Sequence, residues 1–277
     1  MKNLTEKFDL DNRDLVDVFD DMPLWSAPFG LRLLECVQIR KNIKALDIGF
    51  GAGFPLTELA MRLGSSSRIY GIDPWHAAIE RTKRKLEIFG ISNVELFETG
   101  AETIPLPDQS IDLLVSNNGI NNVQDMQGVL DECGRIAKSG AQFVITVNLD
   151  KSMVEFYDLF GLVCKELGFD EAIGKMRSHI YEKRRPLDEF TAMLNDAQFD
   201  ICSIKHDEFA YTFADGSALF EHFFIRLAFL ESWKALLPED QRQHVFAEIE
   251  KRFNTIAKQN GSCKLTIPFV VIDAVRR

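Results

Sequence analysis

An apolar segment that leads directly into three closely spaced glycines limits the possible folds of this chain more than any other feature. Residues 44–55 have the sequence KALDIGFGAGFP, with Gly49, Gly51 and Gly53 at alternate positions. A sharp turn from a strand into a helix, with the backbone close to a ligand, requires residues that lack a Cβ atom. The segment therefore predicts a strand, a ligand-binding glycine loop and a helix, in that order.

Short β-branched segments alternate with longer helical patterns around this loop. The expected strands are residues 43–48, 68–72, 94–97, 111–116 and 141–148, and the expected helices between them are residues 55–63, 75–89 and 124–137. This alternation predicts a parallel sheet with crossover helices.

The alternation loosens after Asn148. We expect helices at residues 153–167 and 187–194, a long strand at 199–213, a helix from Ser217 to about Trp233, another helix before Gly261, and a final strand at 265–275. Two late strands separated by a helical insertion predict an antiparallel pair that closes the sheet, with the insertion as a lid. No linker or repeat divides the chain, so a single domain over residues 1–277 is expected.

Charge and composition narrow the class of partner. The 277 residues carry a formal net charge of −10, and 46% of them are hydrophobic. Nucleic-acid binding needs clustered Lys and Arg, so this balance predicts a small-molecule partner and no nucleic acid. No signal peptide and no bilayer-length apolar segment is apparent, and the five scattered cysteines suggest neither disulfides nor a metal site. We therefore expect a cytoplasmic protein without a membrane span; the sequence does not indicate its oligomeric state.

Two residues beside the glycines indicate what the loop binds. Phe54 stands where the dinucleotide pattern G-x-G-x-x-G has its third glycine, and Asp47 comes two residues before the first glycine. An acidic side chain there would repel a pyrophosphate but would suit a cationic ligand. Asp73 follows the next expected strand, at the position from which a carboxylate accepts hydrogen bonds from ribose hydroxyls. Capping of the helix after Pro74 is a competing role for Asp73.

In this combination the chain resembles the class I S-adenosylmethionine-dependent methyltransferases that act on small molecules. The resemblance covers residues 43–148 and includes the segment TGAETIPLPDQSID at 99–112 and the loop NNGINN at 117–122. The family often has Gly-Asp-Ala-Glu where this chain has Thr99-Gly100-Ala101-Glu102, so the aspartate expected at the adenine is replaced by Gly100. Glu102 or the backbone of Ala101 is the alternative adenine contact.

The resemblance implies an α/β fold: a Rossmann-like, mostly parallel seven-stranded sheet with helices on both faces and an antiparallel last strand. Residues 1–40 would form an N-terminal helical cap, 41–150 the cofactor-binding core, and 151–277 the remaining sheet with a helical lid at roughly 216–260. The implied S-adenosylmethionine site consists of Trp25, Asp47, Gly49, Gly51, Gly53, Phe54, Asp73, Pro74, Ala101, Glu102 and Asn117.

The implied activity is an in-line displacement that moves a methyl group from S-adenosylmethionine to an unidentified small acceptor and leaves S-adenosylhomocysteine. Alignment and water exclusion dominate such a transfer, so no universal catalytic residue is expected. Candidate acceptor contacts are Asn118, Asn122, His179 and His222. The basic run Lys183-Arg184-Arg185 is either a partner for an acidic substrate or a solvated loop. Two other functions remain open: a non-catalytic S-adenosylmethionine-binding protein and a nicotinamide-dependent oxidoreductase.

Overall fold

The computed structural model describes residues 7–9, 11–20 and 25–277. By its internal contacts the chain divides into two compact units. The sheet unit comprises Leu10–Leu149, Pro186–Asp207 and Phe269–Arg277, and the helical unit comprises Met1–Asp9, Asp150–Arg185 and Glu208–Pro268. The single-domain organisation expected from the sequence stays a prediction.

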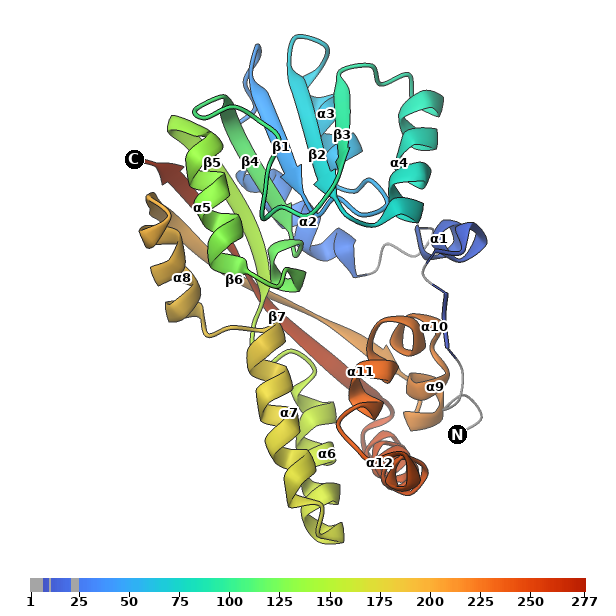
Figure 1. Ribbon diagram of the computed structural model, residues 1–277. Coiled ribbons are helices and arrows are strands. Elements are labelled where there is room, and N and C mark those ends of the chain that lie inside the picture. Colours follow the sequence, from blue (N-terminus) through green and yellow to red (C-terminus); the bar gives the residue numbers. More distant parts are fainter. Residues whose placement is uncertain (1–6, 10, 21–24) are drawn as a thin grey trace. The chain divides into compact units, whose positions relative to one another are not determined.

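The described residues form one seven-stranded sheet in the order β3-β2-β1-β4-β5-β7-β6 (Figure 1). The strands are β1 (Lys44–Ile48), β2 (Arg68–Asp73), β3 (Val94–Glu98), β4 (Ile111–Asn117), β5 (Ala137–Asn148), β6 (Phe199–Phe213) and β7 (Cys263–Arg276). The first five pair in parallel, and β7 pairs antiparallel with β5. The seven-stranded α/β fold and its antiparallel last strand are thereby confirmed.

Helices cover the parallel part of the sheet. They are α1 (Arg13–Asp20), α2 (Ser26–Cys36), α3 (Leu56–Leu63), α4 (His76–Ile88), the short 3-10 helix η1 (Ile120–Asn122), α5 (Met126–Ile136) and α8 (Leu187–Asp196). The helix α2 packs on β4 and β5, α3 on β2, α4 on β3, and α5 against α8. The central strand β1 is buried along its length after Lys44, because β2 and β4 flank it on both sides. The carboxyl ends of β1, β2 and β4 therefore lie next to one another.

The helical unit contains α6 (Val154–Leu167), α7 (Asp170–Lys183), α9 (Gly216–Glu221), α10 (Phe223–Ile225), the π-helical stretch η2 (Arg226–Leu230), α11 (Glu231–Lys234) and α12 (Glu239–Asn260). Aromatic rings fill its core: Phe156 stacks on the fully buried Trp233 with 3.7 Å between ring centroids, and Phe220 packs edge-on against Phe246. No described helix of either unit is long and apolar enough to cross a bilayer.

The helices of the helical unit differ from the sequence predictions in two places. The helix expected from Ser217 to Trp233 is broken, because His222 has an extended backbone (ψ 124°) that ends α9. Its cap is Asp215, whose carboxylate accepts from the Ala218 N–H, while the Ser217 hydroxyl donates to Glu250. The helix α7 was not predicted. Ala172 is its only buried residue, so its sequence lacks a clear apolar stripe.

Candidate functional site

A cavity of about 790 Å³ opens in the sheet unit at the carboxyl ends of β1, β2 and β4. This volume lies within the range of about 300–1,000 Å³ that is usual for small-molecule sites. Its walls come from the glycine loop after β1, the segments after β2, β3 and β4, and the start of α2. The cavity is thus built where ligands bind in open parallel sheets.

The glycine loop has the backbone geometry that its sequence predicts. Gly49 and Gly51 have φ values of +75° and +52°, in the region that favours glycine. The Gly49 N–H donates to the carbonyl of Ile72 at 2.8 Å, which joins the loop to the end of β2. A Cβ atom at Gly49 would lie 2.7 Å from the Cα of Gly119, whereas one at Gly51 would meet nothing within 4 Å. Gly49 is therefore required for packing, and Gly51 leaves open space on the cavity side.

The helix α4 fixes the carbonyl groups of the loop. The Thr82 hydroxyl donates to the Gly51 carbonyl at 3.1 Å, and the Lys85 ammonium donates to the Ala52 carbonyl at 2.8 Å. Arg84 of the same helix pairs with Asp17 of α1. The helix α4 is therefore bonded both to the glycine loop and to α1.

Asp73 ends β2 and holds the loop with both carboxylate oxygens. Its Oδ2 accepts from the Gly51 N–H and its Oδ1 from the Trp75 N–H, each at 2.8 Å. Burial raises the pKa of Asp73, and the two backbone hydrogen bonds partly offset this effect. A carboxylate has about four lone-pair positions, so about two remain for a ligand. The helix α4 has Trp75 as its N-cap and no side-chain capping bond, so the capping role expected for Asp73 is wrong, and its remaining lone-pair positions suit a ligand.

Asp47 has a different environment from the one expected. Its side chain is fully buried, does not line the cavity, and neither carboxylate oxygen has a hydrogen-bond partner among the described residues. Burial, and then the negative charge of Asp73, raise the pKa of Asp47 well above its usual value. These conditions favour the protonated form.

The asparagine loop after β4 links three elements of the sheet unit. The Asn117 side chain donates to the Ser26 carbonyl at the start of α2 and accepts from the Thr146 hydroxyl of β5, both at 3.0 Å. Asn122 lines the cavity, but its amide donates to the carbonyl of Asn118 at 3.1 Å. These side chains therefore hold α2 and the loop in position.

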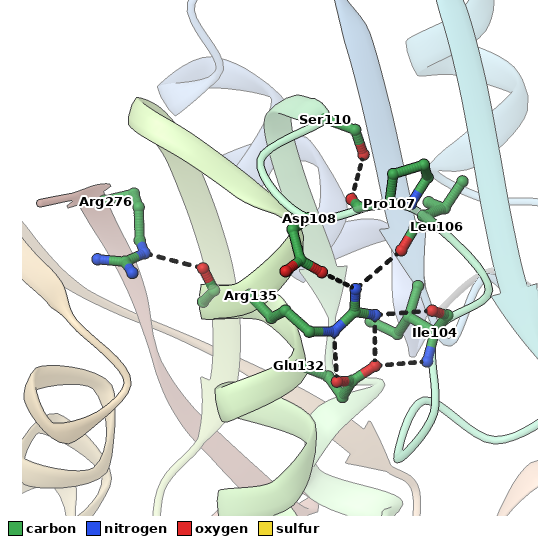
Figure 2. A network of polar contacts seen from close by, with 9 residues as sticks. Ile104, Leu106, Pro107, Asp108, Ser110, Glu132, Arg135 and Arg276 are labelled. Atoms are coloured by element: carbon green, nitrogen blue, oxygen red, sulfur yellow. Dashed lines mark hydrogen bonds and ion pairs between the residues drawn. The ribbon is translucent and has the colours of Figure 1, made fainter.

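The segment after β3 is anchored by Arg135 of α5 (Figure 2). The guanidinium donates to the carbonyls of Ile104 and Leu106, each at 2.9 Å, and pairs with Asp108 and Glu132. The carboxylate of Glu132 in turn accepts from the Ile104 N–H at 2.8 Å. One side chain thus fixes the course of the loop that follows the cavity residues 99–102.

The carboxylate of Glu102 lies next to Gly100, in space that a side chain at position 100 would otherwise enter. A Cβ atom at Gly100 would collide with the carboxylate of Glu102, which occupies the space where a longer side chain at position 100 would begin. Both residues line the cavity. The glycine at the usual aspartate position therefore makes room for a carboxylate from two residues later.

The charges of the lining suit a cation. The carboxylates of Asp73, Glu102 and Asp125 line the cavity, and no Lys, Arg or His is found among its described lining residues. S-adenosylmethionine carries a sulfonium and an ammonium, so the side chains fit this cofactor. The pyrophosphate of a nicotinamide dinucleotide would meet only negative side chains, which disfavours that alternative.

The cavity brings together most of the residues selected from the sequence. Those that line it are Trp25, Gly49, Gly51, Phe54, Asp73, Pro74, Ala101, Glu102, Asn117 and Asn122. Asp47, Gly53 and Asn118 belong to the same unit but not to the lining, and His179 and His222 belong to the helical unit. Lining residues not selected include Phe50, Trp75 and Asp125. Phe50 and Trp75 lie directly after β1 and β2, a signal available in the sequence, whereas Asp125 is the N-cap of α5.

Comparison with known proteins gives a consistent result. Residues 46–145 match the family described as "Methyltransferase domain". The demethylmenaquinone methyltransferase of Geobacillus sp. (strain WCH70) is 27% identical over 190 residues, which cover 65% of this chain and 79% of that protein. The protein of the same name from Geobacillus stearothermophilus is 30% identical over 158 residues, covering 57% and 66% of the two chains.

Solved structures share the fold. The YcgJ protein from Bacillus subtilis superposes with a TM-score of 0.56 at 18% identity, covering 91% of this chain and 98% of that chain. At this level of identity the likeness concerns the fold alone, and it extends over both compact units.

Proposed function

We propose that this chain, a class I S-adenosylmethionine-dependent methyltransferase, methylates a small, uncharged aromatic acceptor of the hydroquinone type. The observation that carries the proposal is the pair of relatives that are named for demethylmenaquinone, a quinone. Their identity to this chain is low, so the acceptor class is proposed here and the exact ring is left to experiment.

The chemistry of the cavity lining supports an uncharged acceptor. A carboxylate or phosphate on the acceptor would face the carboxylates of Glu102 and Asp125 without a basic side chain to offset them. Aromatic side chains, by contrast, are available as walls for a planar ring: Trp25, Phe54 and Trp75. An aromatic wall near a sulfonium also contributes cation–π attraction.

The proposed transfer requires little from the protein beyond positioning. S-adenosylmethionine supplies a methyl group on positively charged sulfur. A ring carbon of the acceptor forms the new bond as the sulfur–methyl bond breaks, and the acceptor then loses the proton from that carbon. Because Asp73 and Glu102 are assigned to the cofactor, the described lining carboxylate left to take up this proton, directly or through water, is Asp125. Alignment and exclusion of water supply the remaining rate enhancement.

We assign the cofactor to the lining residues selected from the sequence, with Asp73 on the ribose and Glu102 at the adenine. The support for Asp73 is its position on the glycine loop, with about two lone-pair positions left for hydroxyl groups. The support for Glu102 is that its carboxylate occupies the space above Gly100. Asn122 is the acceptor-side candidate that also lines the cavity.

A matched pair of substrates tests the acceptor. The protein is incubated with methyl-labelled S-adenosylmethionine and either a reduced naphthoquinone with a free ring position or the same compound already methylated there. We expect label in the product and formation of S-adenosylhomocysteine with the first compound only. If S-adenosylhomocysteine binds but neither neutral hydroquinone is methylated, while an anionic acceptor is, the acceptor class is wrong and the family assignment stands.

A further inference from the structure

The basic run Lys183-Arg184-Arg185 has one member with an unusual environment. The run lies at the end of α7 in the helical unit, and Arg184 forms the C-cap of that helix. Lys183 is exposed and Arg185 is half-buried, but Arg184 is only 4% exposed. The solvated loop expected at this run therefore does not describe its middle residue.

The guanidinium of Arg184 is buried without a negative partner. Its Nη1 donates to the hydroxyl of Tyr157 at 3.3 Å, and its carbon lies 5.4 Å from the centre of the Tyr157 ring. Its Nε is inaccessible to solvent and has no hydrogen-bond partner, and no described carboxylate forms an ion pair with the group. Burial of an unpaired charge is strongly unfavourable, so such a cation is expected to have a counter-ion when the protein functions.

The unused part of the guanidinium is the part that recognises oxyanions. The Nε–H and one N–H of Nη2 point in the same direction and form the edge that makes two parallel hydrogen bonds to a carboxylate or phosphate. In Arg184 the described contacts use only Nη1, on the other side of the group. The hydrogen bond to Tyr157 fixes the guanidinium and leaves this edge without a described hydrogen-bond partner.

The neighbouring groups are also donors or neutral. The Tyr157 hydroxyl accepts from Arg184 and, at 3.2 Å, from the indole N–H of Trp233, so its own hydrogen is left to donate. The His179 ring lies 6.3 Å from the Tyr157 ring, centre to centre. Burial, and then the charges of Arg184 and Lys183, lower the pKa of His179, which leaves the imidazole neutral at pH 7. The cluster therefore carries one uncompensated positive charge.

We propose that Arg184 and Tyr157 form a binding site in the helical unit for a small molecule that bears a carboxylate or phosphate group. The guanidinium edge holds two oxygens of that group, and the hydrogen bond from Nη1 to the Tyr157 hydroxyl, on the other side, keeps the guanidinium in position. The site is built entirely from residues of the helical unit. It does not depend on the acceptor proposed above, and failure of either proposal leaves the other unaffected.

Two simple anions test the site against a matched control. The melting temperature of the protein is followed with increasing benzoate or inorganic phosphate, at pH 7 and at ionic strength held constant with sodium chloride. We expect a saturable rise with at least one anion, retained in Arg185→Met and about tenfold weaker or absent in Arg184→Met. The anion with the stronger response distinguishes a carboxylate ligand from a phosphoryl ligand.

A local probe and a conservative variant complete the test. The indole ¹⁵N–¹H signal of Trp233, identified by its absence in Trp233→Phe, is expected to shift on saturation because this group bonds to the Tyr157 hydroxyl. Arg184→Lys keeps the positive charge but removes the guanidinium edge that makes two parallel hydrogen bonds. We therefore expect this variant to lose most of the anion-dependent rise in melting temperature, and it serves as the test if Arg184→Met does not fold. The proposal is overturned if neither anion gives a saturable response, or if Arg184→Lys responds like the wild type.

Discussion

The two compact units stabilise their buried polar side chains with different kinds of partner. In the sheet unit, backbone groups are among the main partners: Asp73 accepts from two amides, and Arg135 donates to two carbonyls as well as to Glu132 and Asp108. In the helical unit, the chain from Arg184 through Tyr157 to Trp233 consists of side chains alone. Backbone groups are present whatever the sequence, whereas a side-chain partner is lost with one substitution.

This difference indicates which part of the molecule resembles its relatives and which part distinguishes this chain from them. The match to the methyltransferase-domain family, residues 46–145, falls within the sheet unit. A site held by backbone groups is suited to a ligand common to a family, such as the cofactor. Features that distinguish this chain from its relatives are therefore expected in the side-chain contacts of the helical unit. Four variants test this contrast.

The largest effect is expected where the backbone itself forms the contact. In Gly49→Ala the new methyl group would meet the Cα of Gly119, whereas Gly140, with a similar φ of +76°, has nothing within 4 Å of a Cβ. We expect Gly49→Ala to lower the free energy of unfolding by about 1–3 kcal/mol more than Gly140→Ala does. Urea denaturation of both variants measures the difference; equal losses would mean that the approach to Gly119 is not restrictive.

Asp73→Ala tests the carboxylate that joins the loop to the ligand. Removal of this hydrogen-bonding group is expected to weaken S-adenosylhomocysteine binding by about 1–3 kcal/mol, because both the Gly51 amide and the ligand lose a partner. Calorimetric titration measures the affinity, with circular dichroism to verify folding. An unchanged affinity in a folded variant would contradict the ribose assignment.

Asp47→Asn tests the buried carboxyl group of the sheet unit that has no hydrogen-bond partner among the described residues. The raised pKa of Asp47 means that its protonated form is favoured by folding, so its contribution to stability is present at low pH and is lost as pH rises through that pKa. Asparagine does not titrate. We therefore expect the variant to gain stability relative to the wild type as the pH rises from the usual pKa of an aspartate to the raised pKa of Asp47, by up to about 1.4 kcal/mol per pH unit. Parallel pH profiles in urea denaturation would show that Asp47 is ionised and paired.

The smallest effect on stability is expected at Arg184. Replacement by methionine removes a buried charge and adds apolar surface, and such changes are neutral or stabilising even where an ion pair is lost. We expect the free energy of unfolding to change by less than about 1 kcal/mol, or to increase. A loss of several kcal/mol in thermal or urea denaturation would reveal a negative partner and would remove the contrast between the units.

Periodic patterns in the sequence predicted the sheet well. The limits of β6 were predicted to the residue, because its aromatic residues alternate up to Phe213. The start of β5 was missed: Ala137 already pairs with Ile111 before a register shift, and neither alternation nor β-branched residues mark that pairing. In the helical unit, the break at His222 depends on one extended backbone angle, which no pattern in the sequence predicts.

The candidate site was predictable where a local motif defines it and not where burial does. Gly49, Gly51, Asp73 and Glu102 were selected from their order after strands, and they line the cavity. Asp47 is fully buried and Arg184 is only 4% exposed. A sequence does not show such burial, and so the run of three basic residues was interpreted as either a partner for an acidic substrate or a solvated loop.

The position of β7 has a consequence for the order in which the sheet is completed. The strand lies between β5 and β6, although both precede it in the chain. During synthesis, β6 emerges before the only strand to which it bonds in the described sheet, and one edge of β5 stays open until residues 269–275 of β7 have been made. An unpaired strand edge is a template for association with other chains. Nascent or truncated chains that lack β7 are therefore expected to aggregate, even with every cofactor-site residue in place.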